Sequence, residues 1–266
     1  MTGAPLTAGN TRVKETHKLS RRSVRAERRL FLADGPKAVE GALAAGCVVE
    51  VFATATAAQR YDALVAQAPR VSLVDDRALA SLSDSVTPAG VVAVCSFVDV
   101  SLAEALATAP SAGERGLVAL CAEVRDPGNA GTLVRTADAL GADAVVLAGE
   151  SVDLYNPKTV RASAGSVFHL PVACEPDPAR AVRAAKGAGL TVLAADGAGE
   201  VLLDEAGGLL DRPTAWLFGN EAHGLPDALA ALADHRVRIR IRGGAESLNL
   251  ATAAAICLHE SARRRG

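Results

Sequence analysis

The sequence has no long run of apolar residues, although 50% of its 266 residues are hydrophobic. A membrane-spanning helix needs about 20 consecutive apolar residues, and no stretch of the chain approaches that length. The N-terminal segment MTGAPLTAGNTRVKE also lacks the apolar core of a signal peptide. We therefore expect a cytoplasmic protein with no membrane partner, and with enough apolar material for one large domain or two small ones.

Cysteine and histidine are too few and too scattered for a disulfide framework or a metal centre. The five cysteines are an odd number without a CxxC pair, so we expect reduced residues, mostly in the core. The five histidines lack metal-ligand spacing, so we expect no metal. Neither a GxxxxGKS/T phosphate loop nor a GxGxxG turn after the first strand of a domain is present. This disfavours a kinase, an ordinary dehydrogenase and the usual Rossmann type of methyltransferase.

Basic residues are concentrated near the N-terminus, although the net charge of the chain is only −2. Residues 10–29 form a basic arm, with eight lysines and arginines against two glutamates. Such a run is typical of a solvated helix face or a disordered tail, or of a segment that contacts RNA phosphates. For the second interpretation, the candidate RNA-binding residues are Arg21, Arg22, Arg25, Arg28 and Arg29.

A second basic segment, HRVRIRIRGG, alternates arginine with apolar residues. In an extended strand, Arg236, Arg238, Arg240 and Arg242 share one face, and Val237, Ile239 and Ile241 share the other. The apolar face predicts contact with the core. The cationic face fits a solvent-exposed strand, or a surface for RNA or an acidic partner.

Alternating strand and helix patterns predict an α/β fold in two parts. The first part has apolar strands near 48–54, 70–74 and 90–98, and an alanine-rich linker then suggests domains 1–110 and 111–266. Six further apolar strands are predicted at 116–124, 144–149, 166–173, 190–196, 214–220 and 237–241. They indicate a mainly parallel sheet covered by helices on both faces, whose ligands bind beyond the carboxyl ends of the strands.

The first of three polar loops lies in DPGNAGTLVRTADALGAD, residues 126–143. Asn129 is placed to cap the helix that follows, and Arg135 leans back over Gly131, four positions earlier. With no side chain at Gly131, the guanidinium can reach a ligand at the positive end of the helix. The alternative is a packing glycine beside an exposed arginine.

The second and third loops follow later strands. In WLFGNEAHGLP, Gly219 permits close approach of a ligand to the backbone, and Glu221 needs a partner such as Arg135 or a cationic ligand. In RIRGGAESLNLATAAAICLHE, Ser247 can cap a helix and Asn249 lies in its first turn. Ordinary helix capping is the alternative for Ser247.

Together, the three loops resemble the ordered motifs of the SpoU (TrmH) family of RNA ribose 2′-O-methyltransferases. NAGTLVRTADALGAD is similar to the first motif, LFGNEAHGL to the second and IRIRGGAESLNLATAAAICLHE to the third, over residues 116–262 in all. Arg240 departs from the pattern, in which many members have a proline. The stretch RRLFLADGPKAVEGALAAG resembles the family's smaller L30e-like α/β substrate-binding domain, over about residues 20–97.

The resemblance implies a C-terminal parallel-sheet α/β domain with a trefoil knot (the SPOUT fold), a homodimer, and S-adenosylmethionine as methyl donor. The implied cofactor-binding residues are Gly219, Asn220, Ile239, Ile241, Leu248 and Asn249. The implied catalytic residues are Arg135, Asn129, Glu221, Ser247 and Asn249.

The implied reaction is 2′-O-methylation of a ribose in structured RNA, with 23S rRNA favoured over tRNA. Arg135 either loses its proton through burial and acts as the base, or orients the ribose and phosphate while another group takes the proton. Asn129 and Ser247 would hold the ribose and Arg135, and Glu221 would orient Arg135. A non-catalytic RNA-binding or ribosome-assembly protein, and an antibiotic-resistance role through rRNA modification, stay open as alternatives.

Overall fold

The computed structural model describes residues 4–109 and 116–264, so the predicted domain boundary at 110 lies outside the described residues. The chain forms two compact units. The N-terminal unit comprises the residues up to Val98 together with Tyr155–His169, and the C-terminal unit comprises Asp99–Leu154 and the residues from Leu170 onward. The chain therefore passes between the units three times, whereas the sequence predicts a single passage.

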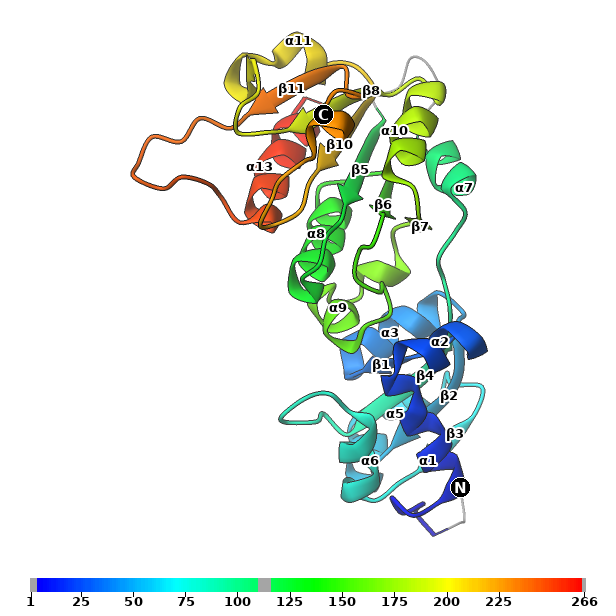
Figure 1. Cartoon of the computed structure of the whole chain (residues 1–266). Coiled ribbons are helices and arrows are strands. Elements are labelled where there is room, and N and C mark those ends of the chain that lie inside the picture. The colour runs from blue at the N-terminus through cyan, green and yellow to red at the C-terminus, as the bar shows by residue number, and fades with distance from the viewer. Residues whose placement is uncertain (1–3, 110–115, 265–266) are drawn as a thin grey trace. The chain divides into compact units, whose positions relative to one another are not determined.

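The N-terminal unit contains a four-stranded mixed sheet with short helices (Figure 1). Its elements are α1 (Thr11–His17), η1 (Lys18–Ser20), α2 (Arg22–Arg28), β1 (Leu30–Asp34), α3 (Pro36–Ala44), β2 (Val48–Ala53), α4 (Ala55–Arg60), α5 (Asp62–Val65), β3 (Val71–Leu73), α6 (Asp76–Leu82), β4 (Val91–Ser96), α9 (Pro157–Ala162) and η2 (Ser166–Phe168). In the order β1-β4-β2-β3, β4 is antiparallel to β1 and β2, and β2 is parallel to β3. The three predicted strands are confirmed, and the basic arm forms α1 and α2.

The returning segment Tyr155–His169 packs with the N-terminal unit through aromatic contacts. The Tyr155 ring stacks on Phe97, with ring centroids 3.8 Å apart, and lies 4.5 Å from the ring centroid of Phe31. The Tyr155 hydroxyl accepts a hydrogen bond from the backbone N–H of Val98 over 2.7 Å. Aromatic burial of this kind stabilises the unit. No periodic pattern in the sequence predicts these aromatic contacts.

The C-terminal unit is a seven-stranded parallel sheet in the order β7-β6-β5-β10-β8-β11-β9. Its elements are α7 (Leu102–Ala107), β5 (Leu117–Ala122), α8 (Pro127–Ala139), β6 (Ala144–Ala148), β7 (Val172–Glu175), α10 (Pro178–Gly187), β8 (Thr191–Ala195), β9 (Val201–Leu202), η3 (Leu203–Glu205), α11 (Gly207–Leu210), β10 (Thr214–Phe218), α12 (Asp227–Ala230), β11 (His235–Arg238) and α13 (Leu250–Ala262). The predicted parallel sheet is confirmed.

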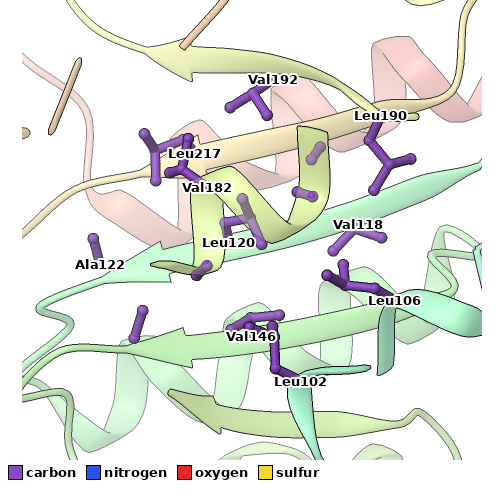
Figure 2. Close-up of a cluster of buried hydrophobic side chains, with 14 of the residues drawn as sticks. Leu102, Leu106, Val118, Leu120, Ala122, Val146, Val182, Leu190, Val192 and Leu217 are labelled. Atoms are coloured by element: carbon purple, nitrogen blue, oxygen red, sulfur yellow. The ribbon is translucent and has the colours of Figure 1, made fainter. Parts of the chain in front are cut away.

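Alternate residues of the central strand β5 face two different helical layers. Val118 and Leu120 belong to a core that also contains Leu102 of α7 and Val182 of α10 (Figure 2). On the other side, α8 and α13 pack against each other and against the sheet (Figure 1). There the buried Trp216 indole N–H donates to the Ser261 hydroxyl over 2.8 Å. Burial on both faces explains why the strands read as continuous apolar runs.

Two predicted strands have different limits in the structure. In the segment 166–173, Ser166–Phe168 is a 3-10 turn of the N-terminal unit, and only the later residues enter β7. In the segment 237–241, β11 ends at Arg238 because its neighbour β9 is only two residues long. The remaining apolar residues of the second segment therefore continue into a loop.

The strand order places β5 beside β10 at the centre of the sheet. The chain builds β6 and β7 on one side of β5, and β8, β11 and β9 lie beyond β10 on the other side. This is a topological switch point, and ligands of open α/β sheets bind at the carboxyl ends of strands at such points. The loops that follow β5 and β10 are thus neighbours.

Within the described residues, no helix has both the length and the apolar composition of a membrane span. All five cysteines are free thiols. Cys95, Cys121 and Cys257 are buried as predicted, Cys47 is partly buried and Cys174 is exposed.

Candidate active site

The loop after β5 turns sharply into α8. Glu123 has a positive φ of 58°, which is uncommon for a residue with a side chain. The N-cap of α8 is Asp126, whose carboxylate accepts a hydrogen bond from the backbone N–H of Asn129 over 2.8 Å. The prediction that Asn129 caps the helix is therefore wrong. Its side chain is free for contacts outside the helix.

The loop after β10 is a tight turn closed by backbone hydrogen bonds. Asn220 and Gly224 exchange N–H to carbonyl bonds, each 2.9 Å long. A Cβ atom on Gly219 would clash with the carbonyl group of Gly224 and lie 2.6 Å from the backbone nitrogen of Leu225. The Asn220 side-chain amide donates to the carbonyl oxygen of Glu123 over 2.8 Å. This bond ties the two loops together.

A chain of polar side chains joins these loops to the start of α13. The Glu221 carboxylate accepts from the backbone N–H groups of Arg125 (3.2 Å) and Asp126 (3.1 Å), and from the side-chain amide of Asn129 (3.3 Å). The Asn129 side-chain oxygen accepts from the amide of Asn249 over 3.0 Å. Asn249 is the N-cap of α13. All three motifs therefore meet in one hydrogen-bonded network.

The network keeps Glu221 ionised. Partial burial raises the pKa of this carboxyl group, but hydrogen bonds from its own backbone N–H, from those of Asp126 and Arg125, and from the Asn129 amide outweigh that effect. The pKa of Glu221 is lowered as a result. Within the described residues of this single chain, the hydrogen bonds of Glu221 run to the loop after β5 and to Asn129, and none runs to Arg135. The orientation of Arg135 by Glu221 stays a prediction.

A cavity of about 270 Å³ opens beside the network at the carboxyl ends of β8, β10 and β11. Seven of the ten residues predicted for catalysis or cofactor binding line it. The cavity is lined by Gly219, Asn220, Glu221, Ile239, Ile241, Ser247 and Leu248, together with Ala195, Asp196, Gly197, Phe218, Ala222, Gly224, Val237, Glu246, Leu250 and Ala253. Asn129 and Asn249 lie in the adjoining network and do not line it.

Arg135 lies elsewhere in the C-terminal unit. It is exposed and lines a groove of about 720 Å³ between α8 and α13, together with residues such as Leu140, Leu203 and Ile256. Among the described residues, Arg135 has no hydrogen bond or ion pair. The expected meeting of Arg135 with Asn129 at one ligand is therefore absent from the described part of this single chain.

The arginines of the second basic segment are partly neutralised. Arg236 pairs with Asp196 over 2.5 Å, and Arg240 lies 3.3 Å from Asp204 and Glu205. Arg238 and Arg242 are exposed. Of the predicted four-arginine face, only Arg238 and Arg242 have no ion pair within residues 4–109 and 116–264, because acidic residues of neighbouring loops pair with the other two.

The basic arm divides into structural and exposed arginines. Arg25 is only 3% exposed, and its guanidinium donates to the carbonyl oxygens of Leu19 (2.9 Å) and Ser20 (2.8 Å). Its assignment to RNA binding is therefore wrong. Arg28 pairs with Glu15 over 2.9 Å, and the Arg29 guanidinium lies 4.7 Å from the centre of the Phe97 ring. Arg21 and Arg22 are exposed.

Sequence reasoning missed the cavity wall after β8. Ala195, Asp196 and Gly197 line the cavity, and Asp196 also holds Arg236. The available signal was the Asp-Gly pair directly after an apolar parallel strand, where ligands bind. Reasoning also missed Glu123, whose conformation is revealed only by the backbone.

Comparison with known proteins finds two family models that match successive parts of the chain. Residues 116–259 match the family model described as SpoU rRNA Methylase family. Residues 10–93 match the MRM3-like substrate binding domain. The first match contains every motif of the hydrogen-bonded network, and the second contains the basic arm.

Some named relatives align with nearly the whole chain, and others with about half of it. The 23S rRNA (guanosine(2553)-2'-O)-methyltransferase RlmP of Bacillus subtilis is 34% identical over 95% of this chain and 96% of its own. The 23S rRNA (uridine(2479)-2'-O)-methyltransferase of Streptomyces viridochromogenes is 40% identical, over 52% of this chain and 50% of that protein. The crystal structure of an AdoMet-bound rRNA methyltransferase from Sinorhizobium meliloti has a TM-score of 0.83 and 33% identity, and covers 98% of this chain and 97% of that one. The chain therefore belongs to the SpoU rRNA methylase family.

Proposed function

We propose that this protein transfers a methyl group from S-adenosylmethionine to the 2′-hydroxyl of a ribose in 23S rRNA. The observation that carries the proposal is the network of Glu221, Asn129 and Asn249, which joins all three family motifs beside a cavity. Relatives named as 23S rRNA 2′-O-methyltransferases support the substrate class. The C-terminal domain would bind the cofactor, and the N-terminal domain would bind RNA.

The cavity suits S-adenosylmethionine chemically. Phe218, Ile239 and Leu248 provide apolar lining for a flat base. Gly219 allows the tight turn that forms part of this lining, because a Cβ atom there would clash with Gly224. The Glu246 carboxylate in the lining suits a ligand that carries positive charge, whereas Asp196 is paired with Arg236 and Glu221 accepts hydrogen bonds from the loop after β5. When bound, the cofactor supplies a methyl group that is already activated for transfer.

The chain's residues would position the ribose and assist loss of the hydroxyl proton. Asn129 and Ser247 are polar groups at the network and at the cavity, and we assign them to holding the ribose. Glu221 accepts three hydrogen bonds from other residues, and these occupy both of its carboxylate oxygens. We assign Glu221 to holding the loops, and proton removal to an RNA phosphate or to water.

We also propose that the protein is a homodimer with the groove between α8 and α13 as its interface. The groove contains Leu140, Leu203 and Ile256, and Ile256 is 37% exposed in the single chain. A second copy would bury this surface. Since Arg135 lines the groove, dimerisation would place Arg135 in the interface, where it can reach RNA bound by either copy.

Ile256→Glu tests this interface, because it places a charge in the apolar groove. Sedimentation should show a dimer for the parent protein and a monomer for the variant. A parent protein that sediments as a monomer would contradict the dimer.

Three further proposals concern the knot, the location and the metal. The C-terminal unit would contain the trefoil knot, formed where the chain after β11 passes into α13. We also propose that the protein is cytoplasmic, which an rRNA substrate would support, and that catalysis uses no metal.

Calorimetry with S-adenosylmethionine, followed by transfer of a labelled methyl group to transcribed 23S rRNA and to tRNA, tests the function. We expect cofactor binding and labelling of 23S rRNA. RNA binding without cofactor binding would favour the non-catalytic alternative.

Arg135→Lys should keep the fold and the cofactor affinity but reduce transfer by about 100-fold, because a lysine cannot reproduce the bidentate guanidinium. Nearly full turnover would rule out an essential guanidinium.

A further inference from the structure

A second cavity lies on the N-terminal unit, within the span that matches a substrate-binding domain. It has a volume of about 280 Å³ and is formed by α1, η1 and the end of α6. Its lining residues are Ala8, Val13, Lys14, His17, Lys18, Arg21 and Ser81. We call it the arm pocket. Four of these side chains are basic types, and none is acidic.

Only some of the basic side chains around the arm pocket are engaged in ion pairs or hydrogen bonds. Lys18 pairs with Glu15 over 2.5 Å, and the His17 ring nitrogen Nδ1 lies 2.6 Å from the carbonyl oxygen of Ser81, to which it donates. Lys14 and Arg21 are both exposed, and their side chains have no ion pair or hydrogen bond with the rest of the described chain. These two cations are therefore available to a ligand.

The other arginines of the basic arm differ in this respect. Arg12 is paired with Glu50, Arg25 is buried on carbonyl oxygens, and Arg28 is paired with Glu15. A new phosphate contact at these positions would have to break an existing interaction. The cationic surface that remains is centred on the arm pocket and the adjoining Arg22.

We propose that the arm pocket binds a backbone phosphate of the RNA substrate, with the Lys14 ammonium and the Arg21 guanidinium as its ligands. Ala8 and Val13 give the pocket an apolar floor on which the attached sugar or base can pack. Phosphate ligation by lysine and arginine supplies affinity that is independent of sequence. The identity of the RNA rests on the proposed function, whereas the use of these two residues rests on the pocket itself.

The test compares two double variants of the full chain that remove the same charge. Lys14→Ala with Arg21→Ala removes the proposed ligands. Lys37→Ala with Arg60→Ala removes two exposed cations of the same unit that do not line the arm pocket. Binding of transcribed 23S rRNA is measured by fluorescence anisotropy over a range of salt concentrations. Thermal unfolding and cofactor calorimetry check that both variants are folded.

We expect the first double variant to bind about tenfold more weakly, and its plot of log affinity against log salt to be shallower by about 0.7, the value for one lost phosphate contact. The control should stay within about twofold of the parent protein. Equal loss in both variants, or unchanged binding in the first, would overturn the proposal. Weaker binding by the first variant to assembled ribosomal subunits, but not to naked rRNA, would assign the pocket to an acidic protein and would also overturn it.

Methyl transfer by the parent protein is measured separately. If it methylates rRNA while the first double variant binds normally, the arm pocket is refuted and the proposed function stands. If it methylates nothing, yet rRNA binding depends on Lys14 and Arg21, the proposed function fails and the arm pocket stands.

Discussion

The side-chain amide of Asn249 donates a hydrogen bond to the side-chain oxygen of Asn129 over 3.0 Å, although the two residues are 120 positions apart in sequence. Asn129 donates in turn to Glu221, whose ionised carboxylate can only accept. The Asn249 oxygen is occupied by the backbone N–H of Ala251. The orientations of both amides are thereby fixed, and the three motif loops are held as one structure.

Asn129→Ala should reduce methyl transfer by about 100-fold, because it disconnects Glu221 from Asn249. Cofactor affinity should change by less than about threefold, since Asn129 does not line the cavity. Single-turnover kinetics and calorimetry measure the two quantities. In a double-mutant cycle with Asn249→Ala, the combined loss should be smaller than the sum of the two single losses. Additive losses would show that the two amides act independently.

Gly219→Ala should abolish cofactor binding, because the new methyl group would clash with the Gly224 carbonyl and force the turn open. Gly187→Ala is the matched control, since a Cβ atom there has open space around it. Calorimetry with S-adenosylmethionine should show parent-like affinity for the control. Normal cofactor binding by Gly219→Ala would mean that this turn does not shape the site.

Glu221 should contribute to stability at neutral pH and lose that contribution in acid. Its pKa in the folded protein is lowered, so the folded state favours the ionised form more than the unfolded state does. The contribution is present above the unfolded pKa of about 4.3 and disappears as the pH falls through the lower folded value. Denaturant titrations of the parent protein and Glu221→Gln should therefore converge with acidification. A stability difference that grows in acid would contradict the lowered pKa.

Arg25→Ala should lower the free energy of unfolding by about 1–3 kcal/mol, because it leaves the carbonyl oxygens of Leu19 and Ser20 without their donor. Arg22→Ala, on the exposed part of the same helix, should change it by less than about 0.5 kcal/mol. Urea denaturation measures both. If the two variants are equally stable, Arg25 has no structural role.

Much of the C-terminal fold could be predicted because its strands are buried on both faces. Strands such as Leu117–Ala122 and Thr214–Phe218 read as apolar runs, and their order in the chain with helices between them indicates a parallel sheet. The end of the strand that begins at His235 could not be predicted. The alternation of arginine and apolar residues continues to Arg242, but strand pairing ends at Arg238 because the neighbouring strand β9 is only two residues long.

The residues of the candidate site were easier to predict than their partners. Glu221 and Asn129 were expected in one site, and they are hydrogen-bonded. Arg135 was expected beside them, yet it lines a separate groove. Helical spacing predicts the face of α8 on which Arg135 lies, but it does not predict which other element packs against that face. Arg25 was indistinguishable from its neighbours in a basic run, since only the tertiary fold brings Leu19 and Ser20 carbonyls to it.

The decisive measurement is a map of 2′-O-methylated riboses in rRNA and tRNA, in cells with the gene and in cells from which it has been deleted. We expect one 2′-O-methylated ribose in 23S rRNA that is present with the gene, absent without it, and restored by the parent protein but not by Asn129→Ala. A methylated ribose that depends on the gene in tRNA alone, or no change in any RNA, would contradict it.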